Sequence, residues 1–166
     1  MSRLFLLRHA KAAWAAPGQH DFDRPLDPAG VADAQATGAA MQRRGFIPGI
    51  TLCSGARRAR ETLSGVAGEA DTGRVLFLDC LYSEDATGYL EAIRKHSAEV
   101  DALLVIGHNP MMEDLALGLA ASHPSAGPLG AGFPTAGLAV IDFDGALAQA
   151  APGTGRLAAF LTASER

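Results

Sequence analysis

Three short polar segments of the sequence each follow a mostly apolar run. The segments are Arg8-His9, Ser54 to Arg58, and Gly107-His108-Asn109. Arginine guanidinium groups match the oxygens of a phosphoryl group, and a histidine imidazole is a competent covalent nucleophile. Brought together, two arginines, two histidines and a serine would recognise a dianion and attack its phosphorus. The residue types therefore indicate phosphate chemistry.

The apolar runs before these segments are typical of buried strands in a parallel sheet. Strands are predicted at 4–7, 50–53, 75–78 and 102–106, alternating with helices that begin near positions 28, 56, 88 and 110. The carboxyl ends of neighbouring parallel strands meet at one edge of a sheet, so the three polar segments are expected to share one crevice. The helix N-termini near positions 56 and 110 would add backbone donors to it.

The helix predicted from position 28 carries the clearest boundary signals. Asp27 is typical of an N-cap, and Pro28 suits the first helical position. Gly45 suits the residue that ends a helix. This helix is therefore expected to run over 28–44.

The C-terminal quarter of the chain has a different pattern. Segments 138–143 and 157–161 are predicted to pair as antiparallel strands, joined through Asp144-Gly145 or a slightly longer connection. Residues 122–137 are rich in Gly and Pro and are predicted to form a long loop. The whole pattern predicts an α/β fold in one domain over 1–166, a three-layer α/β/α sandwich whose mostly parallel sheet has an antiparallel C-terminal edge.

The composition suits an ordinary globular protein. The chain has 166 residues, 48% of them hydrophobic, and a net charge of -4, which leaves no basic surface for nucleic acid. No apolar run approaches the roughly 20 residues of a membrane helix. Cys53 and Cys80 lack metal-type spacing and suit a reduced setting, so a cytoplasmic protein without nucleic-acid or membrane partners is expected.

Two other phosphate chemistries fail on spacing. No Gly-rich segment ends in Gly-Lys-Ser/Thr, so the chain has no nucleotide-binding P-loop motif. At the spacing from Cys53 at which a cysteine phosphatase carries its arginine, this chain has Ala59. The polar segments also lack the carboxylates that hold Mg²⁺ or a dinuclear centre, so no metal and no cofactor is expected.

Three motifs of the chain resemble those of the histidine phosphatase superfamily, whose founding members are the cofactor-dependent phosphoglycerate mutases. They are Arg8-His9-Ala10, Ser54-x-x-x-Arg58-Ala59-x-x-Thr62 and Gly107-His108. Within the superfamily, the short length, Arg8-His9-Ala10-Lys11 and Arg24-Pro25-Leu26 resemble SixA-type phosphohistidine phosphatases. The resemblance runs from residue 3 to about residue 120 and implies a phosphoglycerate mutase-like fold.

The resemblance implies that His9 is the nucleophile and becomes transiently phosphorylated. Arg8, Arg58 and His108 would bind the phosphoryl oxygens and stabilise the charge of the transition state. Attack requires a neutral imidazole. Two nearby arginines are expected to lower the pKa of His9 below the ordinary value of about 6.5.

Three further residues are candidates for substrate binding, each with a structural alternative. Ser54 would cap the following helix and also contact phosphate. Arg24 would either reach the substrate or pair with Asp21 or Asp23. Asn109 would either cap the helix that begins at Pro110 or direct its amide to the ligand.

The proton donor is the least defined part of the predicted site. Many superfamily members carry a glutamate in the loop after the third strand, where this chain has Glu84 and Asp85. Glu84 is the tentative donor, yet either residue would also serve as a cap for the next helix. A phosphohistidine substrate has an imidazole leaving group and demands less of a protein acid than an alkoxide does, so the donor is Glu84, Asp85 or none.

The arginines that flank Arg58 and the histidines outside the three motifs are expected at the surface. These are Arg57, Arg60, His20, His96 and His123.

The leading hypothesis is a metal-independent phosphatase whose substrate is a protein phosphohistidine. The alternatives are a small-molecule phosphomonoesterase or a phosphoglycerate mutase-like enzyme, and, from another class, a non-catalytic phosphate-binding module. Mutases of this type usually carry inserted segments over the site, and this chain has little length for them. The short chain thus favours an open site and a bulky substrate.

Overall fold

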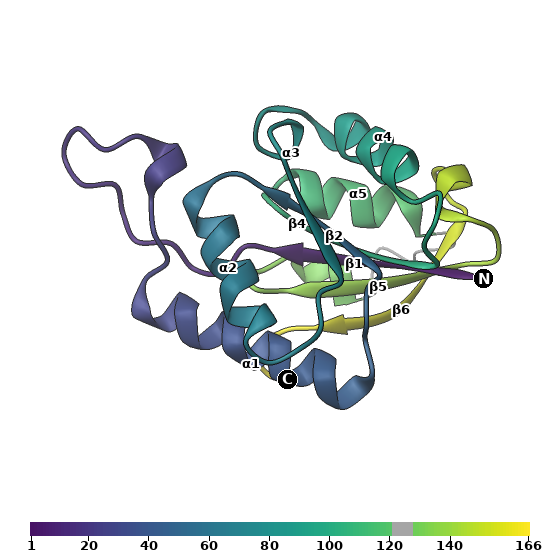
Figure 1. Ribbon diagram of the computed structural model, residues 1–166, viewed down its shortest axis with the longest axis horizontal. Helices are drawn as coiled ribbons and strands as arrows, with labels where there is room; N and C mark the ends of the chain where they lie inside the picture. The colour runs from purple at the N-terminus through teal and green to yellow at the C-terminus, as the bar shows by residue number, and fades with distance from the viewer. Residues whose placement is uncertain (121–127) are drawn as a thin grey trace.

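A six-stranded mixed sheet forms the centre of the molecule in the computed structural model, which describes residues 1–120 and 128–166 (Figure 1). The strands are β1 Ser2–Arg8, β2 Ile50–Ser54, β3 Arg74–Leu78, β4 Ala102–Gly107, β5 Leu138–Phe143 and β6 Gly155–Leu161. Their order in the sheet is β3-β2-β4-β1-β5-β6. The first four strands are parallel, and β5 pairs antiparallel with both β1 and β6, as the sequence predicts.

The register of the central strands aligns the three polar segments. In the parallel pair of β1 and β4, Arg8 lies opposite Gly107, so the next residues, His9 and His108, leave the sheet side by side. On the other side of β4, Cys53 of β2 pairs with Ile106. The carboxyl ends of β1, β2 and β4 therefore form one edge of the sheet.

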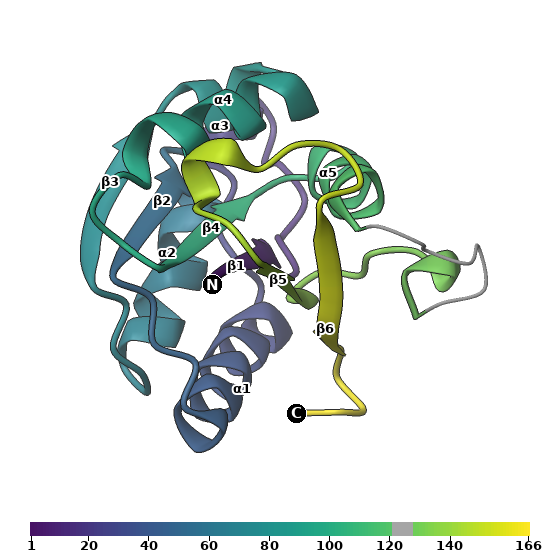
Figure 2. The same cartoon turned by 90° about the vertical axis from the view of Figure 1, so that its right-hand side faces the viewer.

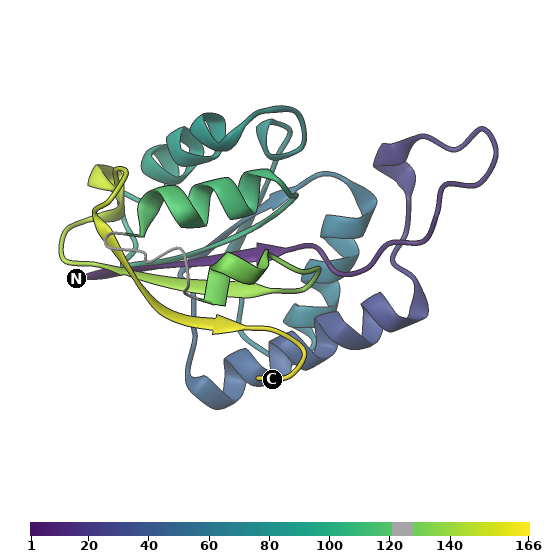
Figure 3. The same cartoon turned by 180° about the vertical axis from the view of Figure 1, so that it is seen from behind.

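Helices cover both faces of the sheet (Figures 2 and 3). The helices are α1 Pro28–Arg44, α2 Arg57–Ala67, α3 Cys80–Ser83, α4 Ala86–His96 and α5 Met111–Leu119. Along β1, Leu4 and Leu6 pack in the core that includes α4 and α5, whereas Phe5 and Leu7 pack in the core that includes α1 and α2. This alternation confirms the three-layer α/β/α sandwich.

Helix α1 begins and ends as its boundary signals predict. The Asp27 carboxylate accepts a hydrogen bond from the backbone N–H of Gly30 at 2.7 Å. Gly45 has a φ of 67°, in the left-handed region that favours glycine after a helix. No helix among the described residues is long and apolar enough to cross a membrane.

Other boundaries differ from the sequence prediction. Helix α3 lies within the segment predicted as a loop, since four residues are too few to show a helical period. The connection between β5 and β6 includes a 3₁₀ helix at Leu147–Gln149, so the strands are joined by more than the Asp144-Gly145 turn. Helix α4 begins at Ala86, two residues before the predicted start.

The segment before β5 packs against the end of β1. Of the predicted loop 122–137, residues 122–127 lie outside the described part of the chain. Residues Pro128–Ala131 form a 3₁₀ helix. The backbone N–H of Ala136 donates to the carbonyl oxygens of Arg8 and His9 at 3.1 and 3.2 Å, which places this segment beside the predicted site.

Candidate active site

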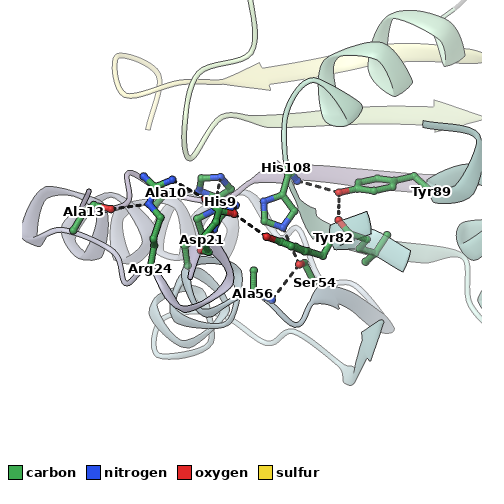
Figure 4. A network of polar contacts seen from close by, with 12 residues as sticks. His9, Ala10, Ala13, Asp21, Arg24, Ser54, Ala56, Tyr82, Tyr89 and His108 are labelled. Atoms are coloured by element: carbon green, nitrogen blue, oxygen red, sulfur yellow. Dashed lines mark hydrogen bonds and ion pairs between the residues drawn. The ribbon is translucent and has the colours of Figure 1, made fainter. Parts of the chain in front are cut away.

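Two histidines, an arginine and a serine meet where β1, β2 and β4 end (Figure 4). The ring centroids of His9 and His108 are 5.1 Å apart. Nε of Arg58 lies 3.4 Å from Nε2 of His9, and Nε2 of His108 lies 2.8 Å from Oγ of Ser54. All four side chains are buried. The structure thus brings together the residues that the sequence places at three separate strand ends.

The hydrogen bonds of His9 define which ring nitrogen can react. Nδ1 lies 2.7 Å from the carbonyl oxygen of Ala10, and a carbonyl only accepts, so Nδ1 carries the proton. The lone pair of the neutral ring is then on Nε2, where it accepts a hydrogen bond from Nε–H of Arg58. Nε2 is consequently the nucleophilic atom of the site.

Burial keeps the His9 ring neutral. The pKa of His9 is lowered to about 4, mainly by burial and also by the charges of Arg58, Arg8 and Arg24, against the hydrogen bond to Ala10, which raises it. The predicted direction of the pKa shift is confirmed, but burial is a larger cause than the arginines. Because His9 is only 9% exposed, a charged imidazolium would lose most of its hydration.

His108 is held from its backbone and from its ring. Its backbone N–H donates to the hydroxyl oxygen of the buried Tyr89 at 3.1 Å, and that hydroxyl donates to the carbonyl oxygen of Leu81. The pKa of His108 is lowered to about 3, mainly by burial and also by the neighbouring His9 and Arg58. Within the described part of the chain, Nδ1 of His108 has no hydrogen-bond partner.

Arg8 is the last residue of β1 and directly precedes His9. One of its terminal nitrogens donates to the carbonyl oxygen of Phe133 at 2.8 Å, while its buried Nε has no partner among the described residues. Burial lowers the pKa of Arg8 from its ordinary value. Arg8 and Asn109 also line a cavity of about 1210 Å³ that continues to Phe160.

Thr62 joins the nucleophile strand to the arginine helix. Its hydroxyl oxygen accepts a hydrogen bond from the backbone N–H of Ala10 at 2.9 Å and donates to the carbonyl oxygen of Arg58 at 2.7 Å. Ala10, whose carbonyl oxygen fixes the His9 tautomer, is thereby tied to the helix that carries Arg58.

Asp21 occupies the outer side of Arg58. Two guanidinium nitrogens of Arg58 donate to the Asp21 carbonyl oxygen at 2.8 Å and to its carboxylate Oδ2 at 3.0 Å. The Tyr82 hydroxyl donates to the same Oδ2 at 2.9 Å, and Arg24 donates to Oδ1 at 3.0 Å. Partial burial opposes ionisation of Asp21, but hydrogen bonds from Arg24 and Tyr82 and the charge of Arg58 lower its pKa to about 2.

Sequence reasoning missed the contact between Asp21 and Arg58 and did not single out Tyr82. Asp21 was considered only as a partner of Arg24, and that pairing is present. No local signal marks Tyr82, because its position depends on the unpredicted helix α3.

The other candidate binding residues have mainly structural contacts. Ser54 is not the N-cap of α2. The helix begins only at Arg57, so its N-cap is Ala56. The hydroxyl oxygen of Ser54 accepts a hydrogen bond from the backbone N–H of Ala56 at 3.2 Å and contacts Nε2 of His108. Asn109 accepts from the backbone N–H of Glu113 at 3.2 Å, as a cap does, and its amide donates to Phe133 O at 3.3 Å.

Neither acidic residue after β3 joins this cluster by a hydrogen bond within the described structure. Asp85 is the N-cap of α4 and accepts from the backbone N–H of Gly88 at 3.1 Å. Glu84 is exposed, and its carboxylate lies over Gly88, where Oε2 fills the space that an added Cβ would need. The geometry therefore provides no contact for the tentative role of Glu84 as proton donor.

The remaining predictions concern residues away from the cluster. Cys53 is a core residue, and burial raises the pKa of its thiol to about 12. Arg57 and Arg60 are exposed, as is His20, while His96 is half-buried and His123 lies outside the described residues. Across residues 1–120 and 128–166, no three His, Cys, Asp or Glu side chains are grouped so as to hold a metal ion.

Sequences and solved structures similar to this chain are known. Residues 4–81 match the family model described as histidine phosphatase superfamily (branch 1). A solved structure from Agrobacterium tumefaciens, provisionally described as phosphohistidine phosphatase SixA, is 36% identical, covers 97% of both chains and has a TM-score of 0.85. A second such structure, from Nakamurella multipartitia, is 30% identical over 97% of this chain and 95% of the other, with a TM-score of 0.82. An uncharacterized protein of Mycobacterium tuberculosis is 34% identical over 160 residues, which are 93% of this chain and 98% of the relative.

Proposed function

The chain belongs to the histidine phosphatase superfamily, and we propose that it is a phosphatase that forms a covalent phosphohistidine at His9. One observation carries the proposal: His9 presents an unprotonated Nε2 beside Arg58, while Ala10 holds the proton on Nδ1. A module that only bound phosphate would need the arginines but not this fixed tautomer.

In the first step, Nε2 of His9 attacks phosphorus in line with the leaving group. The new N–P bond forms as the bond between phosphorus and the leaving atom breaks, and the electron pair of that bond departs with the leaving group. Arg58 and the unpartnered donors of Arg8 and His108 would bind the three phosphoryl oxygens. Such preoriented donors stabilise the transition state because they need no reorganisation.

In the second step, water attacks the phosphohistidine and the N–P bond breaks. The released electron pair returns to Nε2, so His9 regains its starting state and phosphate leaves. The low pKa of His9 makes its neutral ring a good leaving group in this step. No metal is assigned to either step.

We further propose that the substrate is a protein phosphohistidine. The two similar solved structures described as SixA proteins support this substrate class. The site also favours a leaving group that needs little help from a protein acid, since Asp21 is ionised and Glu84 is exposed, with no hydrogen bond to either histidine among the described residues. An imidazole leaving group meets that condition better than an alkoxide does.

The test compares wild type with His9→Ala on an aryl phosphate, free phosphohistidine and a protein phosphorylated on histidine, all in EDTA. We expect wild type to hydrolyse all three, and samples quenched in alkaline detergent to contain a phosphoenzyme that is stable in alkali and lost in acid. His9→Ala should lose both turnover and the phosphoenzyme. Turnover that survives His9→Ala, or that EDTA abolishes, would contradict the mechanism. Preferred turnover of an alkyl phosphomonoester, assayed as a fourth substrate, would instead favour a small-molecule phosphatase.

A further inference from the structure

The two terminal guanidinium nitrogens of Arg58 already donate hydrogen bonds to another residue of the chain, Asp21. Its Nε faces His9, whereas its two terminal nitrogens contact the carbonyl and the carboxylate of Asp21. A phosphoryl group on Nε2 of His9 would seek the donors of this same guanidinium, because arginine binds phosphate oxygens with neighbouring N–H groups. The carboxylate of Asp21 therefore occupies a guanidinium N–H of Arg58 that a phosphoryl group at His9 would use.

The Asp21 carboxylate is itself bound as an oxyanion would be. Oδ2 accepts from Arg58 at 3.0 Å and from the Tyr82 hydroxyl at 2.9 Å, and Oδ1 accepts from Arg24 at 3.0 Å. The rings of Tyr82 and His108 are 5.5 Å apart, so the hydroxyl that holds Oδ2 extends from the wall of the catalytic cluster. Figure 4 shows Asp21 between His9 and Tyr82.

The carboxylate can leave without releasing Arg58. The Asp21 side chain is 51% exposed, while that of Arg58 is only 10% exposed. The contact between Arg58 and the Asp21 carbonyl oxygen, at 2.8 Å, does not involve the carboxylate. The guanidinium carbon of Arg58 also lies over the ring of Tyr82, 5.9 Å from the ring centroid. The guanidinium would thus stay oriented when the carboxylate moves aside.

We propose that the Asp21 carboxylate is a resident competitor for the phosphoryl group, which displaces it from Arg58. This inference rests on the proposed function, because it assumes that the phosphoryl group binds beside His9. Its consequence is selectivity. Inorganic phosphate and small phosphate esters would be held weakly, so the phosphate product would leave readily, and a good substrate would have to bring binding contacts beyond the phosphoryl group.

Binding of tungstate, a phosphate-like dianion, measures this competition directly by calorimetry. Asp21→Asn keeps the size of the side chain and an oxygen acceptor but removes the charge. We expect it to bind tungstate about tenfold more tightly than wild type, as expected for loss of one nearby like charge. Asp21 and Asp23 are the two ends of the 3₁₀ helix Asp21–Asp23. Asp23→Asn is therefore the matched control, since it removes the same charge from an exposed carboxylate that makes no hydrogen bond to Arg58 in the described structure. Its affinity should stay within about twofold.

The competition would be overturned if Asp21→Asn bound tungstate as wild type does or more weakly, or if Asp23→Asn tightened binding equally. A crystal structure of wild type with tungstate gives a second measure. The carboxylate should have left Arg58, and a retained 3.0 Å ion pair beside bound tungstate would contradict displacement. Wild type that neither binds tungstate nor hydrolyses aryl phosphate would instead refute the proposed function. An intact hydrolase with an unchanged Asp21→Asn affinity refutes the competition alone.

Discussion

The wall of the site that consists of strand ends is buried, whereas the opposite wall, from loop 10–26 and α3, is charged and partly exposed. His9, Ser54 and His108 are each at most 9% exposed, and among the described residues their hydrogen-bond partners are backbone groups, one another and Arg58. Asp21, on the other wall, is half-exposed and shares its oxygens among three side chains. The difference indicates a division of roles: the strand wall preorganises the reaction, and the loop wall adjusts what binds. Figure 1 shows loop 10–26 extending past the carboxyl ends of the strands.

The largest expected effect tests the strand wall. His9→Ala removes the nucleophile, and we expect kcat to fall by about 10⁴ with little change in folding. Stopped assays with an aryl phosphate measure the loss. Tyr82→Phe is the comparison from the loop wall and should lose less than about tenfold, because it removes one hydroxyl outside the buried cluster. Equal losses in the two variants would contradict the division of roles.

A pH effect on stability should come from the same buried wall. The folded-state pKa values of His9 and His108, about 4 and about 3, lie below the unfolded value of about 6.5. Between about pH 4 and pH 6.5 the unfolded chain therefore binds more protons than the folded chain. The free energy of unfolding consequently falls as the pH drops from about 6.5 toward 4. We expect the free energy of unfolding in urea to be about 2–4 kcal/mol lower at pH 5 than at pH 7. His9→Gln should remove about half of that difference, and an unchanged slope would show that burial does not keep His9 neutral.

The hydrogen bonds that orient the nucleophile should have a smaller effect on rate. Thr62→Val removes the hydroxyl that joins Ala10 to the Arg58 helix, and we expect kcat to fall about tenfold with KM nearly unchanged. Thr62→Ser should recover most of the rate, because it restores the oxygen. Nitrogen-15 NMR of His9 should show a mixture of ring tautomers in Thr62→Val only. A loss that Thr62→Ser shares would indicate a packing role for the methyl group instead.

The smallest expected effect concerns Glu84. Its side chain is exposed and has no hydrogen bond to the histidine cluster, so Glu84→Gln should change the turnover of phosphohistidine protein by less than about twofold. Parallel assays on an alkyl phosphomonoester test the proton-donor role more severely. A drop above about tenfold on either substrate would assign that role to Glu84 after all.

The sequence alone determined the strand wall. Apolar runs that end in Arg8-His9 and Gly107-His108 predict buried parallel strands, and parallel strands bring their carboxyl ends together. The same local reasoning predicted the ends of α1, because cap residues act within a few positions of the helix that they bound. It also predicted a neutral His9, although it named only the arginines as the cause and not burial, which is the larger one.

Only the tertiary structure decided the loop wall. Arg58 and Asp21 are 37 positions apart in the chain, and the carbonyl that holds Arg8 belongs to Phe133, 125 positions away. The position of Tyr82 depends on α3, a helix of four residues. The exposure of Glu84 depends on the short connection between α3 and α4. Such contacts leave no periodic trace in the sequence, because irregular segments take their course from what they pack against rather than from a repeating backbone hydrogen-bond pattern.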